Sequence, residues 1–424
     1  MKKDTKLKLP TSTEVQIREK EVLFLVPEKP DWEVTDINGA KLLSMCDGSK
    51  TVNELISTLP EELRESALEL LKKLNERGFF AEPLPREKKD KPLLGSVHLN
   101  MTNKCNLKCI YCYAEKRDRD EKQRHLTYDD YIKIIRDAAD INKNVLITFT
   151  GGEPLLNKDT IKLAEFCKSN SIKTFLLTNG CPITPRNAEK ISKLFDTIKT
   201  SLDGDCAELH DRQRGIGSFN RVMKAKELLE KYGANLKFAC TVTQLNKDHL
   251  RGLVDMLGNR LSFQPIYALG DERLKKIGIT GEEYLDILFS LGNVDLFNGT
   301  KQYMEQLRGK GCVRCAVGEG EISIAPTGEV YPCHMLHFDE LVCGNVFETS
   351  FKEIYYSSEI LNKIRNMSVD TKENCKRCNI RYICGGGCWA RAYLESKNLE
   401  TPDSFCEYND VCFSEAFFTH PHGE

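Results

Sequence analysis

No stretch of this sequence approaches the ~18 consecutive apolar residues that a membrane-spanning helix requires. The N-terminal segment contains lysines but no apolar core and no small-residue cleavage site, so we expect no signal peptide. Neither sign of charge is in excess, because 61 lysines and arginines stand against 63 aspartates and glutamates. This balance argues against nucleic acid or an anionic membrane as a partner. Together these absences predict a soluble, cytoplasmic protein.

Cysteine, by contrast, is abundant, with 18 cysteines in 424 residues. In a small secreted chain this number would indicate disulfides. This chain is long, however, and many of its cysteines have the C-x2-C spacing that is typical of metal-binding proteins. A chain of this length is expected to form two or three domains.

The first cysteine cluster is a C-x3-C-x2-C run made of Cys105, Cys109 and Cys112, just after the alternating segment Val97–Met101. Structural zinc usually has four protein ligands, and a [4Fe–4S] cluster is usually held by four cysteines. Three local thiolates on a cubane cluster would leave one iron open to a substrate or cofactor. A zinc site completed by a distant residue is the alternative.

Residues 10–82 predict a small domain of strands followed by three short helices. Apolar and polar residues alternate over residues 12–27, as in half-buried strands, and the first helix is expected to end near Cys46. This order is winged-helix-like. A winged helix that binds nucleic acid is the alternative, but the third helix mixes acidic and basic residues and offers no basic recognition face.

Turn and capping signals place the remaining boundaries of this domain. Asp47-Gly48 predicts a turn after the first helix. Thr51 and Glu54 form a capping-box pair that opens a helix over Val52–Leu59, and Pro60 begins the third helix.

Strand and helix patterns alternate through residues 95–275. The predicted strands are Val97–Met101, Val145–Thr150, Lys173–Thr178, Ile198–Leu202, Leu236–Thr243 and Leu261–Ile266. The helical patterns between them are Tyr128–Ala139, Lys158–Ser169, Pro185–Phe195, Phe219–Lys231 and Lys247–Leu257. Six βα units are too few for an eight-stranded barrel but suit a partial (β/α)6 barrel of parallel strands. Chemistry in such folds lies at the C-terminal ends of the strands, where the cysteine run falls.

Glycine-rich or polar motifs follow three successive predicted strands. Gly151-Gly-Glu-Pro154 follows the second strand; its glycines would let the backbone approach a ligand closely, and Glu153 could take the charge of a bound amine. Thr178-Asn-Gly180 ends the third strand. Ser201-Leu-Asp-Gly204 ends the fourth and offers hydroxyl and carboxylate groups to a sugar. Each motif alone is compatible with a glycine turn, but one motif per successive loop favours a ligand site.

A second group of cysteines lies within residues 311–424. Cys312 and Cys315 precede a predicted hairpin that turns at Thr327-Gly328 and leads to Cys333. The other members of the group are Cys375, Cys378, Cys384, Cys388 and Cys406. Eight cysteines supply four ligands to each of two sites, and by spacing alone a pair of zinc ribbons is the alternative.

The central segment resembles the radical SAM superfamily in its three-cysteine run, its Gly151–Pro154 motif, and the Ser201–Gly204 segment with His210-Asp-Arg212 after it. The resemblance implies a [4Fe–4S] cluster on Cys105, Cys109 and Cys112 whose open iron binds S-adenosylmethionine (AdoMet). It implies reductive cleavage of AdoMet to a 5′-deoxyadenosyl radical that abstracts hydrogen from a substrate. The expected AdoMet-binding residues are Tyr111 at the adenine, Gly151, Gly152, Glu153 and Pro154 at the amine, Asn179, and Ser201, Asp203 and Arg212 toward the ribose.

The C-terminal pattern resembles the SPASM domain, which binds two auxiliary [4Fe–4S] clusters. The resemblance implies that Cys315, Cys333 and Cys388 hold the first cluster with Cys312 as its fourth ligand. The second would be held by Cys375, Cys378, Cys384 and Cys406, which gives three clusters in all. The remaining cysteines are expected to be small buried hydrophobic residues: Cys46, Cys167, Cys181, Cys206, Cys240, Cys343 and Cys412.

Residues 10–82 resemble the PqqD-like family in Trp32, Leu43 and the segment Cys46–Leu55. Such domains capture a leader peptide as an added strand. The charged, proline-flanked residues 83–94 are expected to be a linker, and residues 276–310 a bridging helical segment.

These resemblances imply a radical SAM enzyme that installs a thioether or another cross-link in a ribosomally made peptide. Its partners would be a precursor peptide and an electron donor such as ferredoxin or flavodoxin. Three alternatives remain: an enzyme acting on a small molecule or tetrapyrrole, a peptide epimerase, and a non-catalytic metal scaffold or DNA-binding regulator.

Overall fold

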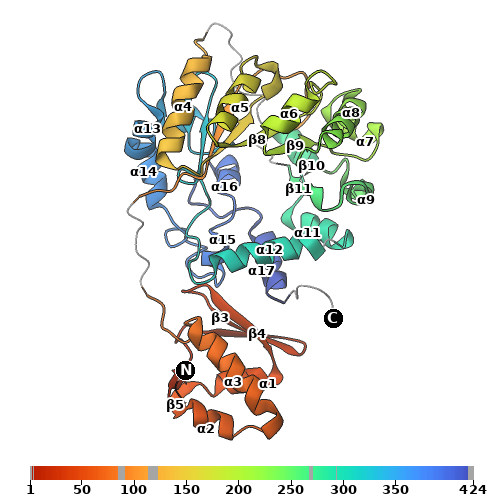
Figure 1. Ribbon diagram of the computed structural model, residues 1–424. Coiled ribbons are helices and arrows are strands. Elements are labelled where there is room, and N and C mark those ends of the chain that lie inside the picture. The colour runs from red at the N-terminus through yellow and green to blue at the C-terminus, as the bar shows by residue number, and fades with distance from the viewer. Residues whose placement is uncertain are drawn as a thin grey trace.

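The computed structural model describes residue 2 and residues 4–84, 91–112, 123–266, 271–292 and 294–418, with the backbone alone for residues 294–299. Part of the predicted linker, residues 85–90, lies outside these ranges. An N-terminal domain, a central barrel and a cysteine-rich C-terminal part are visible in Figure 1. Within the described ranges, no helix is both long enough and apolar enough to cross a membrane.

Six parallel strands form the central sheet, as the sequence predicts. They are β6 (Ser96–Asn100), β7 (Leu146–Thr150), β8 (Lys173–Thr178), β9 (Thr197–Ser201), β10 (Leu236–Val242) and β11 (Leu261–Pro265). The strands lie in sequential order, and each neighbouring pair is parallel. The intervening helices cover the outside (Figure 1): α4 (Tyr128–Ile141), α5 (Thr160–Ser169), α6 (Ala188–Leu194), α8 (Ser218–Lys231) and α9 (Arg251–Leu257). The predicted partial barrel is therefore confirmed.

The predicted hairpin at Thr327-Gly328 is present, but it belongs to the barrel sheet. Its strands are β12 (Glu321–Ile324) and β13 (Glu329–Tyr331), and β13 also pairs with the short strand β14 (Gly344–Asn345). Strand β12 pairs with β6 in parallel, so the sheet continues past the first barrel strand. The cysteine-rich part is thereby joined to the strand that precedes the first cysteine run.

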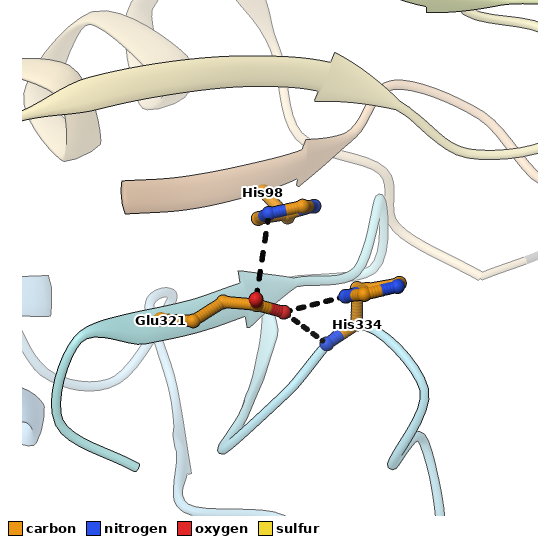
Figure 2. Close-up of side chains that lie close together, drawn as sticks. All are labelled: His98, Glu321 and His334. Carbon is orange, nitrogen blue, oxygen red and sulfur yellow. Dashed lines mark hydrogen bonds and ion pairs between the residues drawn. The ribbon is translucent and has the colours of Figure 1, made fainter. Parts of the chain in front are cut away.

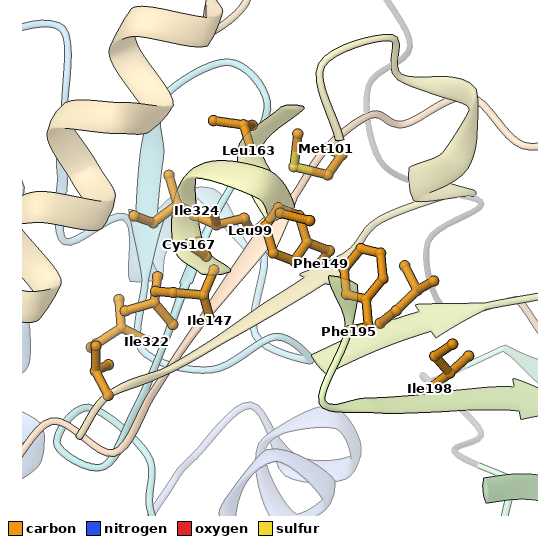
Figure 3. Packing of buried hydrophobic residues seen from close by; sticks show 14 of the residues in the cluster. Leu99, Met101, Ile147, Phe149, Leu163, Cys167, Phe195, Ile198, Ile322 and Ile324 are labelled. Atoms are coloured by element: carbon orange, nitrogen blue, oxygen red, sulfur yellow. The ribbon is translucent and has the colours of Figure 1, made fainter. Parts of the chain in front are cut away.

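Alternation along the strands sends apolar side chains outward and polar side chains inward. Leu99 of β6 and Phe149 of β7 are fully buried in the core between sheet and helices, where Leu163 and Cys167 of α5 also lie (Figure 3). The alternate positions of β6 carry polar residues such as His98. The barrel interior therefore has a polar lining at this strand.

The N-terminal domain contains the expected strands and three helices. A three-stranded antiparallel sheet consists of β2 (Glu14–Arg18), β3 (Glu21–Val26) and β4 (Asp31–Asp36). The helices are α1 (Ile37–Ser44), α2 (Val52–Ser57) and α3 (Glu61–Glu76), and the predicted capping box of α2 is present.

The predicted turn at Asp47-Gly48 is wrong, because β5 (Asp47–Thr51) begins there and pairs with β1 (Lys6–Lys8). Aspartate and glycine are depleted in strands, so local propensity points to a turn. Pairing with a strand some forty residues upstream outweighs that preference.

The N-terminal sheet packs directly against the C-terminal part of the chain. Leu23, Leu25 and Trp32 share a hydrophobic cluster with residues of α12 (Val294–Leu307), α15 (Arg381–Cys384) and α17 (Cys406–Phe418). Figure 1 shows β3 and β4 next to α12 and α17. The Trp32 ring meets Phe417 edge to face, with ring centroids 5.4 Å apart. Strand β3 is thus buried on both faces, since Phe24 and Val26 belong to the domain's own core.

We expect Trp32→Ala to lower the free energy of unfolding by about 3–5 kcal/mol, because it removes a buried aromatic side chain from this contact. Chemical denaturation followed by circular dichroism measures the change. The matched control is Ile17→Ala, whose side chain is 76% exposed on β2 and should matter by less than about 0.5 kcal/mol. Equal losses in the two variants would contradict a packed interface.

Candidate functional site

The three cysteines of the first run lie in the loop that follows β6, and all three thiols are partly buried. The backbone amide of Leu107 lies 3.4 Å from the Cys105 sulfur, and the side-chain amide of Asn179 lies 3.6 Å from it. A guanidinium nitrogen of Arg214 is 4.0 Å from the Cys109 sulfur. N–H groups directed at sulfur favour thiolates, the form that binds metal. The donor set therefore fits an iron–sulfur cluster.

Burial raises the pKa of Cys109 to about 11, and the Arg214 guanidinium opposes that rise. Without metal, the thiol form is therefore favoured at neutral pH. Metal binding would release this proton, as is usual for thiol ligands.

The two glycines after β7 are required by a backbone contact. A Cβ atom on Gly151 would lie 2.5 Å from the carbonyl oxygen of Thr102, and one on Gly152 would clash with that of Lys104. The amide of Gly152 donates to the Thr102 carbonyl at 2.7 Å, and the amide of Glu153 donates to Lys104 at 2.9 Å. The glycines thus fix the cysteine loop against the end of β7. The backbone that approaches these two glycines closely is therefore that of the cysteine loop.

The Glu153 side chain is fully buried and links the ends of β7 and β8. Its carboxylate accepts hydrogen bonds from the Asn179 amide at 2.7 Å, the Thr178 hydroxyl at 2.8 Å and the Leu155 amide at 3.1 Å. Burial raises its pKa to about 7, although these donors favour the ionised form. The Glu153 carboxylate therefore positions Asn179 near Cys105. The contact of Glu153 with the amine of a bound ligand remains a prediction.

Asp203 lies at the centre of a buried charged cluster. Its carboxylate accepts from Arg214 at 2.5 Å and 3.2 Å, from the Thr241 amide at 2.9 Å, and from the Tyr111 hydroxyl. The Arg214 guanidinium also lies 5.4 Å from the centroid of the Tyr111 ring. The sequence predicts that Asp203 contacts a sugar, whereas in the structure its carboxylate binds these protein groups. The cluster connects the end of β9 to the cysteine run.

Arg212, the arginine expected toward the ribose, is exposed on α7 (Ala207–Arg214). On the same helix, Arg214 and His210 are buried instead. The Nδ1 atom of His210 accepts a hydrogen bond from the Asp203 amide at 3.1 Å. The spacing of four residues between His210 and Arg214 puts both on one helix face, and that spacing was the signal available in the sequence. Ser201 lies half-buried at the end of β9.

Asp211 closes the loop between α7 and α8. Its carboxylate accepts from the Phe219 amide at 2.8 Å, the Gly217 amide at 2.5 Å and the Ser218 hydroxyl at 3.0 Å. Burial opposes its ionisation, but these donors outweigh burial and hold its pKa below the usual value.

We expect Asp211→Asn to destabilise the protein by about 0.5–2 kcal/mol at neutral pH, because the amide has one acceptor oxygen where the carboxylate accepts three hydrogen bonds with both of its oxygens. A depressed carboxyl pKa gives a contribution that is present above the unfolded pKa and is lost as pH falls through the folded pKa. The variant and the wild type should therefore converge in acid. Unfolding midpoints measured at pH 7 and below pH 4 test this, and a constant difference at all pH values would contradict it.

The second cysteine group lines two adjacent cavities. One, of about 440 Å³, is lined by Cys312, Cys315, Cys333, Cys384 and Cys388. The other, of about 300 Å³, is lined by Cys375, Cys378, Cys384 and Cys406. Each set of four predicted ligands thus faces one cavity, and Cys384 faces both.

The segment between the two cavities is unusually rich in glycine. Gly385, Gly386 and Gly387 all have positive φ, from +64° to +79°. A Cβ atom on Gly385 would lie 2.9 Å from the Cys312 sulfur. The Cys312 thiol donates a hydrogen bond to the Arg314 carbonyl oxygen at 2.7 Å. The role of Cys312 as a ligand of the first auxiliary cluster remains a prediction.

The other seven cysteines differ in burial. Cys46, Cys167, Cys240, Cys343 and Cys412 are buried, as predicted, and Cys181 is partly buried. For Cys206 the prediction is wrong, because this residue is exposed at the start of α7.

Comparison with known proteins gives two domain matches in this order along the chain. Residues 99–257 match the radical SAM superfamily, and residues 315–379 match the SPASM iron–sulfur cluster-binding domain.

Two curated relatives illustrate the range of named activities. The AdoMet-dependent heme synthase of Oleidesulfovibrio alaskensis is 27% identical over 359 residues, covering 77% of this chain and 90% of that protein. The mycofactocin maturase MftC of Mycolicibacterium smegmatis is 26% identical over 344 residues, covering 77% of this chain and 86% of that protein.

Solved structures share the fold at low sequence identity. The structure of anSMEcpe with bound AdoMet has a TM-score of 0.65 at 22% identity and covers 77% of this chain and 93% of its own. The structure of Streptococcus suis SuiB bound to precursor peptide SuiA has a TM-score of 0.60 at 17% identity. The match covers 95% of this chain and 100% of the SuiB chain. The likeness to SuiB therefore extends over nearly the whole chain.

Proposed function

We propose that this chain, a radical SAM enzyme with a SPASM domain, modifies a ribosomally made peptide by forming a thioether or another cross-link. The observation that carries the proposal is the N-terminal sheet, which ends in an open edge strand and is packed against the cysteine-rich domain. The likeness to the structure of SuiB bound to its precursor peptide SuiA, which covers 95% of this chain, supports it. So does the peptide maturase among the relatives.

The leader peptide would extend the N-terminal sheet at β2. This strand pairs with β3 on one side and forms the edge of the sheet. Val15 and Ile17 are 52% and 76% exposed there, and an exposed apolar edge is suited to strand addition. At the opposite edge, the Trp32 carbonyl of β4 already accepts hydrogen bonds from Arg77 and Arg308.

We expect Ile17→Lys to weaken leader binding by more than about tenfold, equivalent to about 1.4 kcal/mol, because it places a charge where an apolar pocket contact would form. Fluorescence anisotropy of a labelled leader measures the affinity. Ile37→Lys is the matched control, since Ile37 is a half-exposed apolar residue of the same domain on α1. Equal affinities in both variants would contradict β2 as the docking edge.

In this proposal Cys105, Cys109 and Cys112 hold the cluster that binds AdoMet. When bound, cluster and AdoMet supply the one-electron radical chemistry. The chain's own contribution is to bury the cysteine loop, direct N–H groups of Asn179 and Arg214 at its sulfurs, and exclude water. AdoMet contacts are proposed for Tyr111, Gly151, Gly152, Glu153, Pro154, Asn179, Ser201 and Asp203.

The cysteine-rich domain would hold two more [4Fe–4S] clusters, one in each of its cavities. Cys312, Cys315, Cys333 and Cys388 are the proposed ligands of the first, and Cys375, Cys378, Cys384 and Cys406 those of the second. The clusters would accept the electron left after bond formation or help to position the substrate. A ferredoxin or flavodoxin is the proposed electron donor.

The decisive experiment is anaerobic reconstitution with dithionite, AdoMet and any peptide encoded beside this gene, read by mass spectrometry. A loss of two hydrogens from the peptide would establish a cross-link. An unchanged composition with deuterium uptake from solvent would establish epimerisation instead. Formation of 5′-deoxyadenosine with no change in any such peptide would overturn the peptide assignment.

A second candidate is a tetrapyrrole or other small-molecule substrate, favoured by the 27% identity to an AdoMet-dependent heme synthase. It predicts that a tetrapyrrole, and no peptide, raises the yield of 5′-deoxyadenosine. It also predicts that Ile17→Lys leaves turnover unchanged.

A further inference from the structure

Three side chains that no cysteine motif includes lie close together (Figure 2), and two of them line the cavity of about 440 Å³ that Cys315 and Cys333 also line. His98 lies on β6, Glu321 begins β12, and His334 follows Cys333. One carboxylate oxygen of Glu321 is 3.8 Å from Nε2 of His98, and the other is 2.5 Å from Nδ1 of His334. One ligand atom from each of the three residues can be chosen so that all lie within 4.8 Å of one another.

The sheet fixes this arrangement. Parallel pairing places Ser96 beside Glu321 and His98 beside Ser323, so the side chains meet across adjacent strands. The two imidazole rings lie nearly parallel, 9° apart in plane, with centroids 4.8 Å apart. The amide of His334 also donates to Glu321 at 3.1 Å, which ties the loop after β13 to β12. The three residues are thus placed by paired strands and one short loop.

All three side chains are largely enclosed by protein, with His98 12% and His334 31% exposed. The Glu321 side chain is 20% exposed, and in the described part of the chain its ion-pair partners are the two imidazoles. The Nδ1 atom of His98 is buried and has no hydrogen-bond partner among the described residues.

We propose that His98, Glu321 and His334 form a binding site for one divalent transition-metal ion, Zn²⁺ or Fe²⁺. Two imidazoles and one carboxylate are an established ligand set for both ions. Ligand atoms at the usual ~2.1 Å from a tetrahedral ion lie about 3.4 Å apart. One ligand atom from each residue lies within 4.8 Å of the other two, so the side chains would have to draw closer together when an ion binds.

The site would keep open positions, because only three residues supply ligands. Glu321 and His334 line the cavity of about 440 Å³ that also receives the first auxiliary cysteines. Water could therefore complete the coordination from the cavity side, next to the cluster proposed for the same cavity. The inference does not depend on the identity of the substrate, and it concerns an ion additional to the proposed clusters.

The test is metal analysis of the full-length, cluster-reconstituted protein after exposure to one of the two ions and desalting. Zn²⁺ should be retained at about one ion per chain by the wild type, and Fe²⁺ as about one iron without accompanying sulfide. His98→Gln and Glu321→Gln should each lose that ion while keeping their sulfide content and circular dichroism spectrum. Iron and sulfide are counted separately, so failure of the proposed peptide chemistry leaves this result unaffected.

His337→Gln is the matched control. His337 is a nearby imidazole whose Nε2 lies 2.8 Å from the Ser323 hydroxyl, outside the three-residue group, and this variant should retain the ion. Retention that is equal in all variants would place the ion elsewhere, for instance on cysteine, and overturn the proposal. No retained ion in the wild type would also overturn it and leave the pairing of Glu321 with two imidazoles as the role of the group.

Discussion

Replacing Cys105, Cys109 and Cys112 together by alanine is expected to abolish formation of 5′-deoxyadenosine from AdoMet by the reduced protein. The three thiols lie in one loop after β6, and they are the proposed ligands of the AdoMet-binding cluster. The backbone amides of Gly152 and Glu153 hold the start of this loop. Liquid chromatography of the reaction mixture measures the product. Iron should fall from about twelve to about eight atoms per chain, because the auxiliary cysteines are untouched.

The control for this variant is Cys206→Ser, which changes an exposed cysteine of the same barrel. It should keep both product formation and iron content. Retained AdoMet cleavage in the triple variant would refute the assignment of the cluster. Loss of all iron would show instead that the variant does not fold well enough to test it.

Arg214→Ala should lower the free energy of unfolding by about 3–5 kcal/mol, because it leaves the fully buried carboxylate of Asp203 without its cation. The same change removes the guanidinium from the neighbourhood of Cys109 and Tyr111. We therefore also expect impaired loading of the first cluster. Chemical denaturation and iron analysis measure the two effects.

Arg212→Ala is the matched control, since Arg212 lies on the same helix two residues earlier but is exposed. Its effect on unfolding should stay within about 0.5 kcal/mol. If Arg212→Ala and Arg214→Ala behave alike, the buried cluster around Asp203 does not carry the stability that we assign to it.

Local sequence patterns predict most of the fold. The six barrel strands and their helices are recognisable because period-2 and period-3.6 patterns alternate between glycine-rich turns. The capping box at Thr51 and Glu54 and the hairpin at Thr327-Gly328 are equally local, and both are present. The clustering of the polar strand ends follows from parallel topology, since the C-terminal ends of parallel strands meet at one edge.

The features that remained hidden depend on contacts between distant segments. The pairing of β12 with β6 brings Glu321 to His98 across more than two hundred residues. Arg214 was missed because α7 was not predicted and the neighbouring Arg212 is equally plausible by sequence. The glycines at residues 151 and 152 carried a correct signal for close approach, but only the structure shows that the partner is the cysteine loop.

The double burial of β3 constrains how the domains of this protein can be exchanged. Leu23 and Leu25 face the C-terminal helices while Phe24 and Val26 face the N-terminal core, so every central residue of the strand is committed to one of two interfaces. A chimaera that imports an N-terminal domain from another protein would therefore need a strand that is apolar on both sides. A donor strand with a polar outer face would leave the apolar surface of α17 and α15 open to solvent. If the leader peptide docks at β2 as proposed, its recognition is accordingly better engineered at that strand than by replacement of the whole domain.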